Sequence, residues 1–210
     1  GRDEHGSRRD EVQGKTKLVP QTAPGVPDVQ MHAAFVNTEA ANAPLAGILL
    51  THLHLDHVSG VAAAKRAFDV PVYLHRDDVF LYDAAAQQGL MFGVRIEQPP
   101  PVDRFYEMSA GEDLGFGDFA VDVLHTPGHC PGGVCLAVGP RDSNARELLV
   151  GDTLFAQSIG RTDLPGGDHE TLMRSIREVL FAFPDGTVVH PGHGPSTTIG
   201  EERRSNPFLR

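Results

Sequence analysis

The fold is decided by residues 48–57, which read Ile48-Leu49-Leu50-Thr51-His52-Leu53-His54-Leu55-Asp56-His57. The first three residues form a short, wholly apolar run, as expected for a buried strand. His52 and His54 point to the same side of an extended backbone, because side chains alternate along a strand. A turn that begins near Asp56 would bring Asp56 and His57 to a neighbouring position. We therefore expect a loop at the carboxyl end of a strand, with imidazole and carboxylate groups that could serve two metal ions.

Three later segments each place a candidate metal ligand just after a strand and beside glycines. These ligands are His129, Asp152 and His193. Glycine allows the backbone to turn tightly and to approach other groups closely. Burying this many imidazole and carboxylate groups without a cation would cost on the order of several kcal/mol. One such turn is weak evidence, but four segments of this kind predict a metal centre.

Together, the four segments resemble the metallo-β-lactamase superfamily. The pattern is His-x-His-x-Asp-His at 52–57, Thr-Pro-Gly-His at 126–129, Gly-Asp-Thr at 151–153 and Gly-His-Gly at 192–194. The block 151–167 and the segment 200–209 look like the glyoxalase II-like (hydroxyacylglutathione hydrolase-like) branch, in particular its short bacterial hydrolases. The resemblance covers residues 44–210.

This resemblance implies an α/β fold, the four-layer αβ/βα metallo-β-lactamase sandwich, with its site at one edge of two facing sheets. It also implies how the ligands divide: His52, His54 and His129 for one metal, Asp56, His57 and His193 for the other, and Asp152 as a bridge. Nitrogen and oxygen ligands without a thiolate suit two divalent ions. We expect zinc, with iron or manganese as alternatives.

The implied activity is that of a metal-dependent hydrolase that cleaves a thioester, a small-molecule substrate. Two cations lower the pKa of a shared water molecule toward neutrality, and the resulting metal-bridging hydroxide attacks the substrate carbonyl. A thiolate leaves readily, whereas a poorer leaving group would take a proton from Asp56 or from a metal-bound water molecule. Asp56 and Asp152 are therefore expected to act in catalysis as well as to hold metal.

Strands and helices alternate along the rest of the chain, which supports the α/β class. Residues 1–17 are nearly all polar, so we expect a disordered tail there and a single domain over residues 18–210. Expected strands lie at 71–75, 119–124, 134–138, 147–150 and 187–189, and expected helices at 28–41, 58–68, 76–92 and 168–183.

The N-terminal part departs from the family pattern. Members usually open with two apolar strands and an Asp-Pro-Gly turn, but the first strand would fall here on the charged residues 1–14 and the turn reads Ala23-Pro24-Gly25. The missing aspartate would normally support the metal-binding loop. The sandwich could therefore have an incomplete N-terminal edge, and a non-catalytic relic stays an alternative.

The sequence also leaves more than one substrate and more than one type of reaction open. Full-length glyoxalase II enzymes carry a C-terminal helical extension with basic contacts to glutathione, which this sequence lacks, so the acyl and thiol parts stay open. A mononuclear-iron persulfide dioxygenase shares the fold and much of the motif set. Lactonases of the superfamily are disfavoured, because they carry a tyrosine where this chain has Phe155.

Composition excludes several other classes. The 210 residues include 18 Lys and Arg against 28 Asp and Glu, for a net charge of −10, which disfavours nucleic acid and anionic membrane surfaces as partners. No apolar run is long enough for a transmembrane helix. Cys130 and Cys135 make no disulfide framework, so we expect a reducing compartment, the cytoplasm. The oligomeric state stays open.

Some residues near these motifs have competing explanations. His75 could line the cleft or cap a strand, and His125 is expected to pack rather than to bind metal. Cys130, next to His129, is expected to point away from the metals. Arg161 and Asp163 are expected to form a structural pair that braces the loop beyond Asp152.

Overall fold

The computed structural model describes residues 46–108 and 113–210. The expected tail at 1–17, the helix at 28–41 and the first strands of the family pattern lie outside these ranges. Among the described residues, no helix combines the length and the apolar character needed to cross a membrane.

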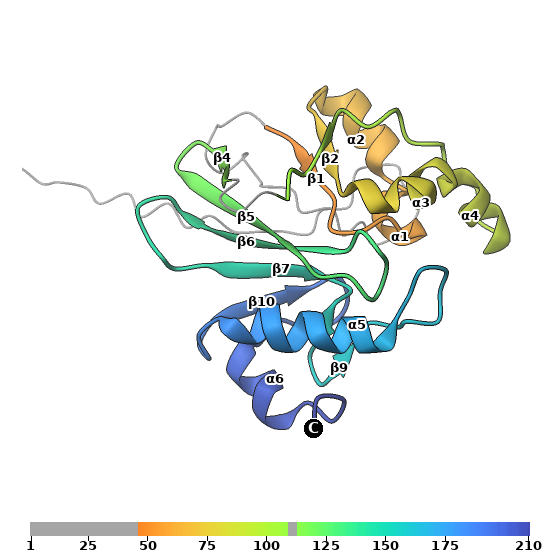
Figure 1. The fold of residues 1–210 in the computed structure, drawn as a ribbon. Coiled ribbons are helices and arrows are strands. Elements are labelled where there is room, and N and C mark those ends of the chain that lie inside the picture. The colour runs from red at the N-terminus through yellow and green to blue at the C-terminus, as the bar shows by residue number, and fades with distance from the viewer. Residues whose placement is uncertain (1–45, 109–112) are drawn as a thin grey trace, which may run out of the picture.

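Two β-sheets face each other, and helices cover the outer side of each (Figure 1). This is the four-layer αβ/βα arrangement that the sequence predicted. The helices are α1 Leu55–Val58, α2 Val61–Phe68, η1 Arg76–Asp78, α3 Val79–Asp83, α4 Ala85–Met91, α5 His169–Arg174, η2 Ser175–Val179, η3 Leu180–Ala182 and α6 Ile199–Ser205. The strands are β1 Ile48–Leu49, β2 Val72–Leu74, β3 Arg104–Phe105, β4 Asp113–Phe116, β5 Phe119–His125, β6 Val134–Pro140, β7 Glu147–Gly151, β8 Leu154–Phe155, β9 Ser158–Ile159, β10 Val188–Pro191 and β11 Thr197–Thr198.

The smaller sheet has three parallel strands in the order β1-β2-β3. Parallel neighbours need a crossover, and helices α1 to α4 with η1 supply the two that are required. The larger sheet has the order β11-β10-β7-β6-β5-β4 and is antiparallel except between β7 and β10, where α5 lies in the crossover. A small hairpin, β8-β9, follows β7.

Successive side chains of a strand pack on opposite faces of its sheet, and this divides the core into layers. In β6, Val134 and Leu136 pack between the two sheets, whereas Cys135 packs with Leu172 and Ile176 under the second helical layer. Successive side chains of a strand point to opposite faces, so an almost continuous apolar run serves both layers. The Cys135 side chain is fully buried in this core.

Most expected elements are present, with differences in detail. The helix expected at 58–68 is present as α2, which begins three residues later and follows the separate short helix α1. The helix expected at 76–92 is divided among η1, α3 and α4. The helix expected at 168–183 is capped by Asp168, which accepts a hydrogen bond from the Thr171 amide, but its middle turn is a π-helix. Strands β3, β4, β8, β9 and β11 and helix α6 were not expected from the sequence.

Candidate metal centre

The seven expected ligands gather at one edge of the two sheets. Each comes from the segment that follows a strand, as is typical of sites in α/β folds. His52 and His54 lie in the loop after β1, Asp56 and His57 in α1, His129 in the turn between β5 and β6, Asp152 after β7, and His193 after β10.

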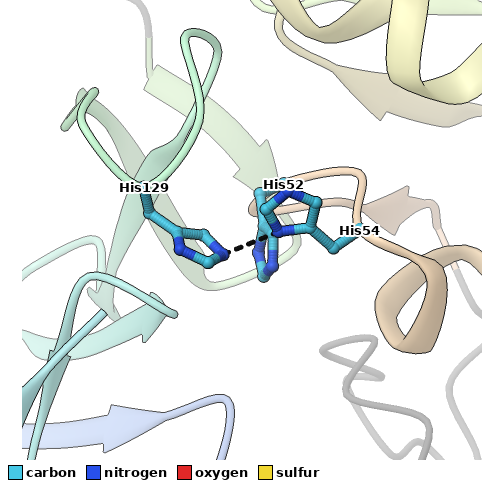
Figure 2. Close-up of side chains that lie close together, drawn as sticks. All are labelled: His52, His54 and His129. Atoms are coloured by element: carbon cyan, nitrogen blue, oxygen red, sulfur yellow. Dashed lines mark hydrogen bonds between the residues drawn. The ribbon is translucent and has the colours of Figure 1, made fainter. Parts of the chain in front are cut away.

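Three histidines form the first group, with rings that converge from two different loops (Figure 2). His54 Nδ1 lies 2.7 Å from Nε2 of His129, and the ring of His52 is centred 4.8 Å from that of His129. His129 Nδ1 lies 2.8 Å from the carbonyl oxygen of Arg161. A carbonyl can only accept, so Nδ1 carries the proton, and the Nε2 lone pair of the neutral ring is directed at the group.

The second group is Asp56, His57 and His193, and Asp152 lies between the two groups. Asp56 Oδ2 is 2.8 Å from His193 Nε2 and 3.4 Å from His57 Nε2. Asp152 Oδ2 is 3.8 Å from His129 Nε2 and 3.5 Å from His193 Nε2, and Asp152 Oδ1 is 3.4 Å from His57 Nε2. One carboxylate therefore contacts ligand atoms of both groups, as a bridging ligand must.

Burial and neighbouring charges shift the pKa values of His52, His54 and Asp152. Burial lowers the pKa of His52 well below the usual 6.5 and that of His54 to about 4, and neighbouring histidines add to both shifts. Burial alone would raise the pKa of Asp152, but the hydrogen bond and the charge of His57 bring it below the usual 3.8. Neutral imidazoles and an ionised carboxylate are the states that metal ligands require.

The donor atoms fit a pair of divalent cations. His52 Nε2 and His54 Nε2 are buried without a hydrogen-bond partner, which is costly in a protein interior unless another ligand is present. The donors are nitrogen and oxygen only, because the Cys130 thiol is directed at Asp78 instead. The expectation that Cys130 points away is therefore confirmed.

A buried carboxylate that the sequence did not reveal holds the turn that carries His129. Asp78 is fully buried; it accepts hydrogen bonds from the Gly132 amide at 2.6 Å and from the Cys130 thiol at 2.9 Å. Burial raises its pKa against the effect of these two bonds. Asp78 therefore fixes the peptide segment directly after His129.

A second buried carboxylate holds the hairpin after Asp152. Glu202, in α6, accepts hydrogen bonds from the Gln157 amide, the Thr197 hydroxyl and the Asn206 side chain, at 2.9, 2.6 and 2.8 Å. The C-terminal helix is thereby joined to β8-β9, which forms one side of the site. The Thr-x-x-Glu pattern at 198–201, a helix-capping signal, could have revealed this helix.

Glycine is required where the backbone passes next to the ligands. A Cβ on Gly192 would lie 2.8 Å from Cε1 of His57 and would also collide with Oδ1 of Asp152. Any other residue would displace one of these two side chains. This explains why the loop with His193 contains a glycine at this point.

The remaining residues considered in the sequence make contacts that support the fold. His75 accepts a hydrogen bond from the Asp77 amide and caps η1, and its ring stacks on that of His125 at 4.3 Å with an interplanar angle of 9°. In-plane lone pairs of parallel rings do not converge, so this pair packs rather than chelates. Arg161 and Asp163 form the expected pair, with two contacts of 2.7 Å, on the surface.

Comparison with known proteins agrees with this geometry. Residues 29–193 match the family model of the metallo-beta-lactamase superfamily. Hydroxyacylglutathione hydrolase GloC of Haemophilus influenzae is 40% identical over 163 residues, which cover 77% of this chain and 74% of the relative.

Two solved structures are similar in both sequence and fold. The di-iron-bound form of TTHA1623 is 44% identical with a TM-score of 0.65 and covers 77% of this chain and 76% of its own. BLEG-1 B3 metallo-beta-lactamase is 42% identical with a TM-score of 0.69 and covers 78% and 77%. The family match, these relatives and the histidine and aspartate cluster lead to one conclusion: the chain belongs to the metallo-β-lactamase superfamily and is a metallo-hydrolase of that fold.

Proposed function

We propose that this metallo-hydrolase is a two-metal thioester hydrolase of the glyoxalase II-like kind. The observation that carries the proposal is the position of Asp152, whose two oxygens contact histidines of both groups. A single-metal enzyme would need only one of these groups. The similarity to a hydroxyacylglutathione hydrolase from Haemophilus influenzae supports the thioester as substrate.

In this proposal His52, His54 and His129 hold one cation, Asp56, His57 and His193 hold the other, and Asp152 contacts both. When bound, the cations would supply a water molecule with a pKa near neutrality and polarise the substrate carbonyl. We propose zinc, and the di-iron form of a similar protein makes iron the first alternative.

Groups of the protein itself orient the metal ligands and move the proton that a leaving group needs. The carbonyl of Arg161 keeps the proton of His129 on Nδ1, which leaves Nε2 as the ligand atom. Asp56 lines the cleft with 40% of its side chain exposed, so its carboxylate can accept a proton from the attacking water and pass it to a leaving group. A thiolate needs little of this help, which favours a thioester over an amide or an alkyl ester.

The test combines metal content with a substrate panel. The purified chain is stripped, reloaded with Zn²⁺, Fe²⁺ or Mn²⁺, and assayed with thioesters that include S-lactoylglutathione, with a β-lactam, and for O₂ uptake with glutathione persulfide. We expect about two metal ions per chain and thioester hydrolysis above all other activities. Asp152→Ala should lose nearly all activity and metal, whereas the exposed Asp118→Ala should retain both.

Three results would overturn the proposal. One iron per chain with O₂ uptake would identify a persulfide dioxygenase. Faster hydrolysis of the β-lactam than of any thioester would identify a lactamase. A folded chain that binds no metal after reloading would be a non-catalytic relic.

A further inference from the structure

A cleft of about 720 Å³ opens over the cluster and has two apolar walls. One wall comes from α3 and the end of α4, and the other from the β8-β9 hairpin and the loop after it. The apolar side chains in question are Leu81, Met91, Phe92, Phe155, Ile159 and Leu164.

The wall at α4 exposes large apolar side chains to water. Met91 is 83% exposed and Phe92 is 63% exposed, and Leu90 beside them is 65% exposed. Contiguous apolar surface of this kind is uncommon on proteins unless something covers it. Because Met91 and Phe92 line the cleft, a ligand bound at the cluster could cover them and gain from the contact.

Outside the histidine and aspartate cluster, the cleft has little positive charge that could bind an anionic substrate. Arg161 is the only lysine or arginine among the described residues that line it. Its guanidinium forms two contacts of 2.7 Å with the Asp163 carboxylate. The pair is electrically neutral, so it does not provide the unpaired positive charge that a peptide thiol with two carboxylates would favour.

We propose that the cleft binds an uncharged, apolar substituent of the thioester, seated between α4 and the β8-β9 hairpin. This inference rests on the proposed function, and it specifies the substrate class for the same site. Either the acyl chain or the thiol could carry the substituent, because the chemistry of recognition is the same. Thioesters with a medium-length alkyl or aryl group should then be better substrates than S-lactoylglutathione.

The catalytic test uses acyl thioesters of N-acetylcysteamine, an uncharged thiol, with acetyl, butyryl and hexanoyl groups. The kcat/KM should rise about fourfold for each added CH₂, as expected for burial of a methylene group. Acetyl thioesters of butanethiol and hexanethiol carry the chain on the thiol side. Their kcat/KM values, compared with those of S-butyryl and S-hexanoyl N-acetylcysteamine, show which side of the thioester the cleft accepts. A flat series, with S-lactoylglutathione as the best substrate, would overturn the proposal.

Two exposed phenylalanines provide a matched pair of variants. Phe92→Ser removes a side chain of the cleft wall and should lower the ratio of hexanoyl to acetyl kcat/KM about fivefold. Phe68→Ser removes a side chain that is 50% exposed at the end of α2, outside the cleft, and should leave that ratio unchanged. Equal ratios in both variants would contradict a binding role for the wall.

Asp163→Asn tests the charge argument directly. The variant leaves Arg161 without its carboxylate partner and should raise kcat/KM for S-lactoylglutathione relative to acetyl N-acetylcysteamine about threefold at low ionic strength. The gain should disappear at high salt. An unchanged ratio at low salt would show that the pair does not set the preference.

A binding series separates failure of this inference from failure of the proposed function. Calorimetry measures the affinity of S-methyl, S-butyl and S-hexyl N-acetylcysteamine, which contain no thioester, for the metal-loaded protein. Affinity that rises with chain length without any thioester hydrolysis would preserve the apolar ligand class and refute the reaction. Hydrolysis without a rise in affinity or kcat/KM would refute the ligand class and preserve the reaction.

Discussion

The buried carboxylate of Asp78 allows a quantitative test of how the turn that carries His129 is held. Asp78→Ala removes two charge-assisted hydrogen bonds, at 2.6 Å from the Gly132 amide and 2.9 Å from the Cys130 thiol. Each such bond contributes about 1.5–3 kcal/mol, and the Gly132 amide would be left buried without a partner. Removing the carboxylate also relieves the cost of burying it, so we expect the lower end of the sum, about 3 kcal/mol of unfolding free energy.

The same substitution should weaken metal binding, because His129 lies next to Cys130 in this turn. Loss of groups that orient metal ligands lowers affinity about 10- to 100-fold, and we expect about tenfold for a contact that acts through the backbone. Urea unfolding of the metal-free chain measures the stability, and competition with a chromophoric chelator measures Zn²⁺ affinity.

Asp77→Ala is the matched control, since this neighbouring carboxylate is 59% exposed and should change stability by less than about 0.5 kcal/mol. Asp78→Asn retains the size and one acceptor, and should fall between the control and Asp78→Ala. If Asp78→Ala lost less than about 1 kcal/mol and bound Zn²⁺ as well as the control, the turn would not depend on Asp78.

Three further predictions concern stability. Because burial lowers the pKa of His54 to about 4, this residue binds a proton in the unfolded chain at a higher pH than in the folded chain. The free energy of unfolding of the metal-free chain should therefore fall by about 2 kcal/mol between pH 7 and 5. A urea midpoint that does not change over this range would contradict the prediction. Gly128, at φ +130°, would place a Cβ 2.6 Å from that of Leu172, so Gly128→Ala should cost about 3 kcal/mol in thermal unfolding, whereas Gly186→Ala, with open space around it, should cost little. Glu202→Ala removes three hydrogen bonds to a buried carboxylate and should lower the free energy of unfolding by about 3 kcal/mol, against about 0.5 kcal/mol for the exposed Glu201→Ala; similar losses would argue against the role assigned to Glu202.

Local patterns predicted the elements that are apolar, long or capped. The apolar run at 48–50 forms strand β1 over its first two residues because it is buried on both faces. Asp168 caps α5 because its side chain accepts a hydrogen bond from the Thr171 amide. The two-residue strands β3 and β8 carry too few residues for any periodicity to be visible. They form because tertiary neighbours provide their hydrogen-bond partners.

By itself, the sequence determined which side chains to propose as metal ligands, and the structure brings these side chains together. His52, His54, Asp56 and His57 are close in the chain, and each of the other ligands stands in a short glycine-containing turn after a strand. Such patterns are visible because ligand chemistry and turn chemistry are local.

Only the tertiary structure decided how these side chains are held and what the cleft can accept. Asp78 and Gly132 are 54 residues apart, and Gln157 and Glu202 are 45 apart, so no local pattern connects them. The apolar walls likewise come from α4 and from the β8-β9 hairpin, which meet only when the two halves of the sandwich pack. Buried polar contacts and shared cavities depend on distance in space, which a linear pattern does not contain.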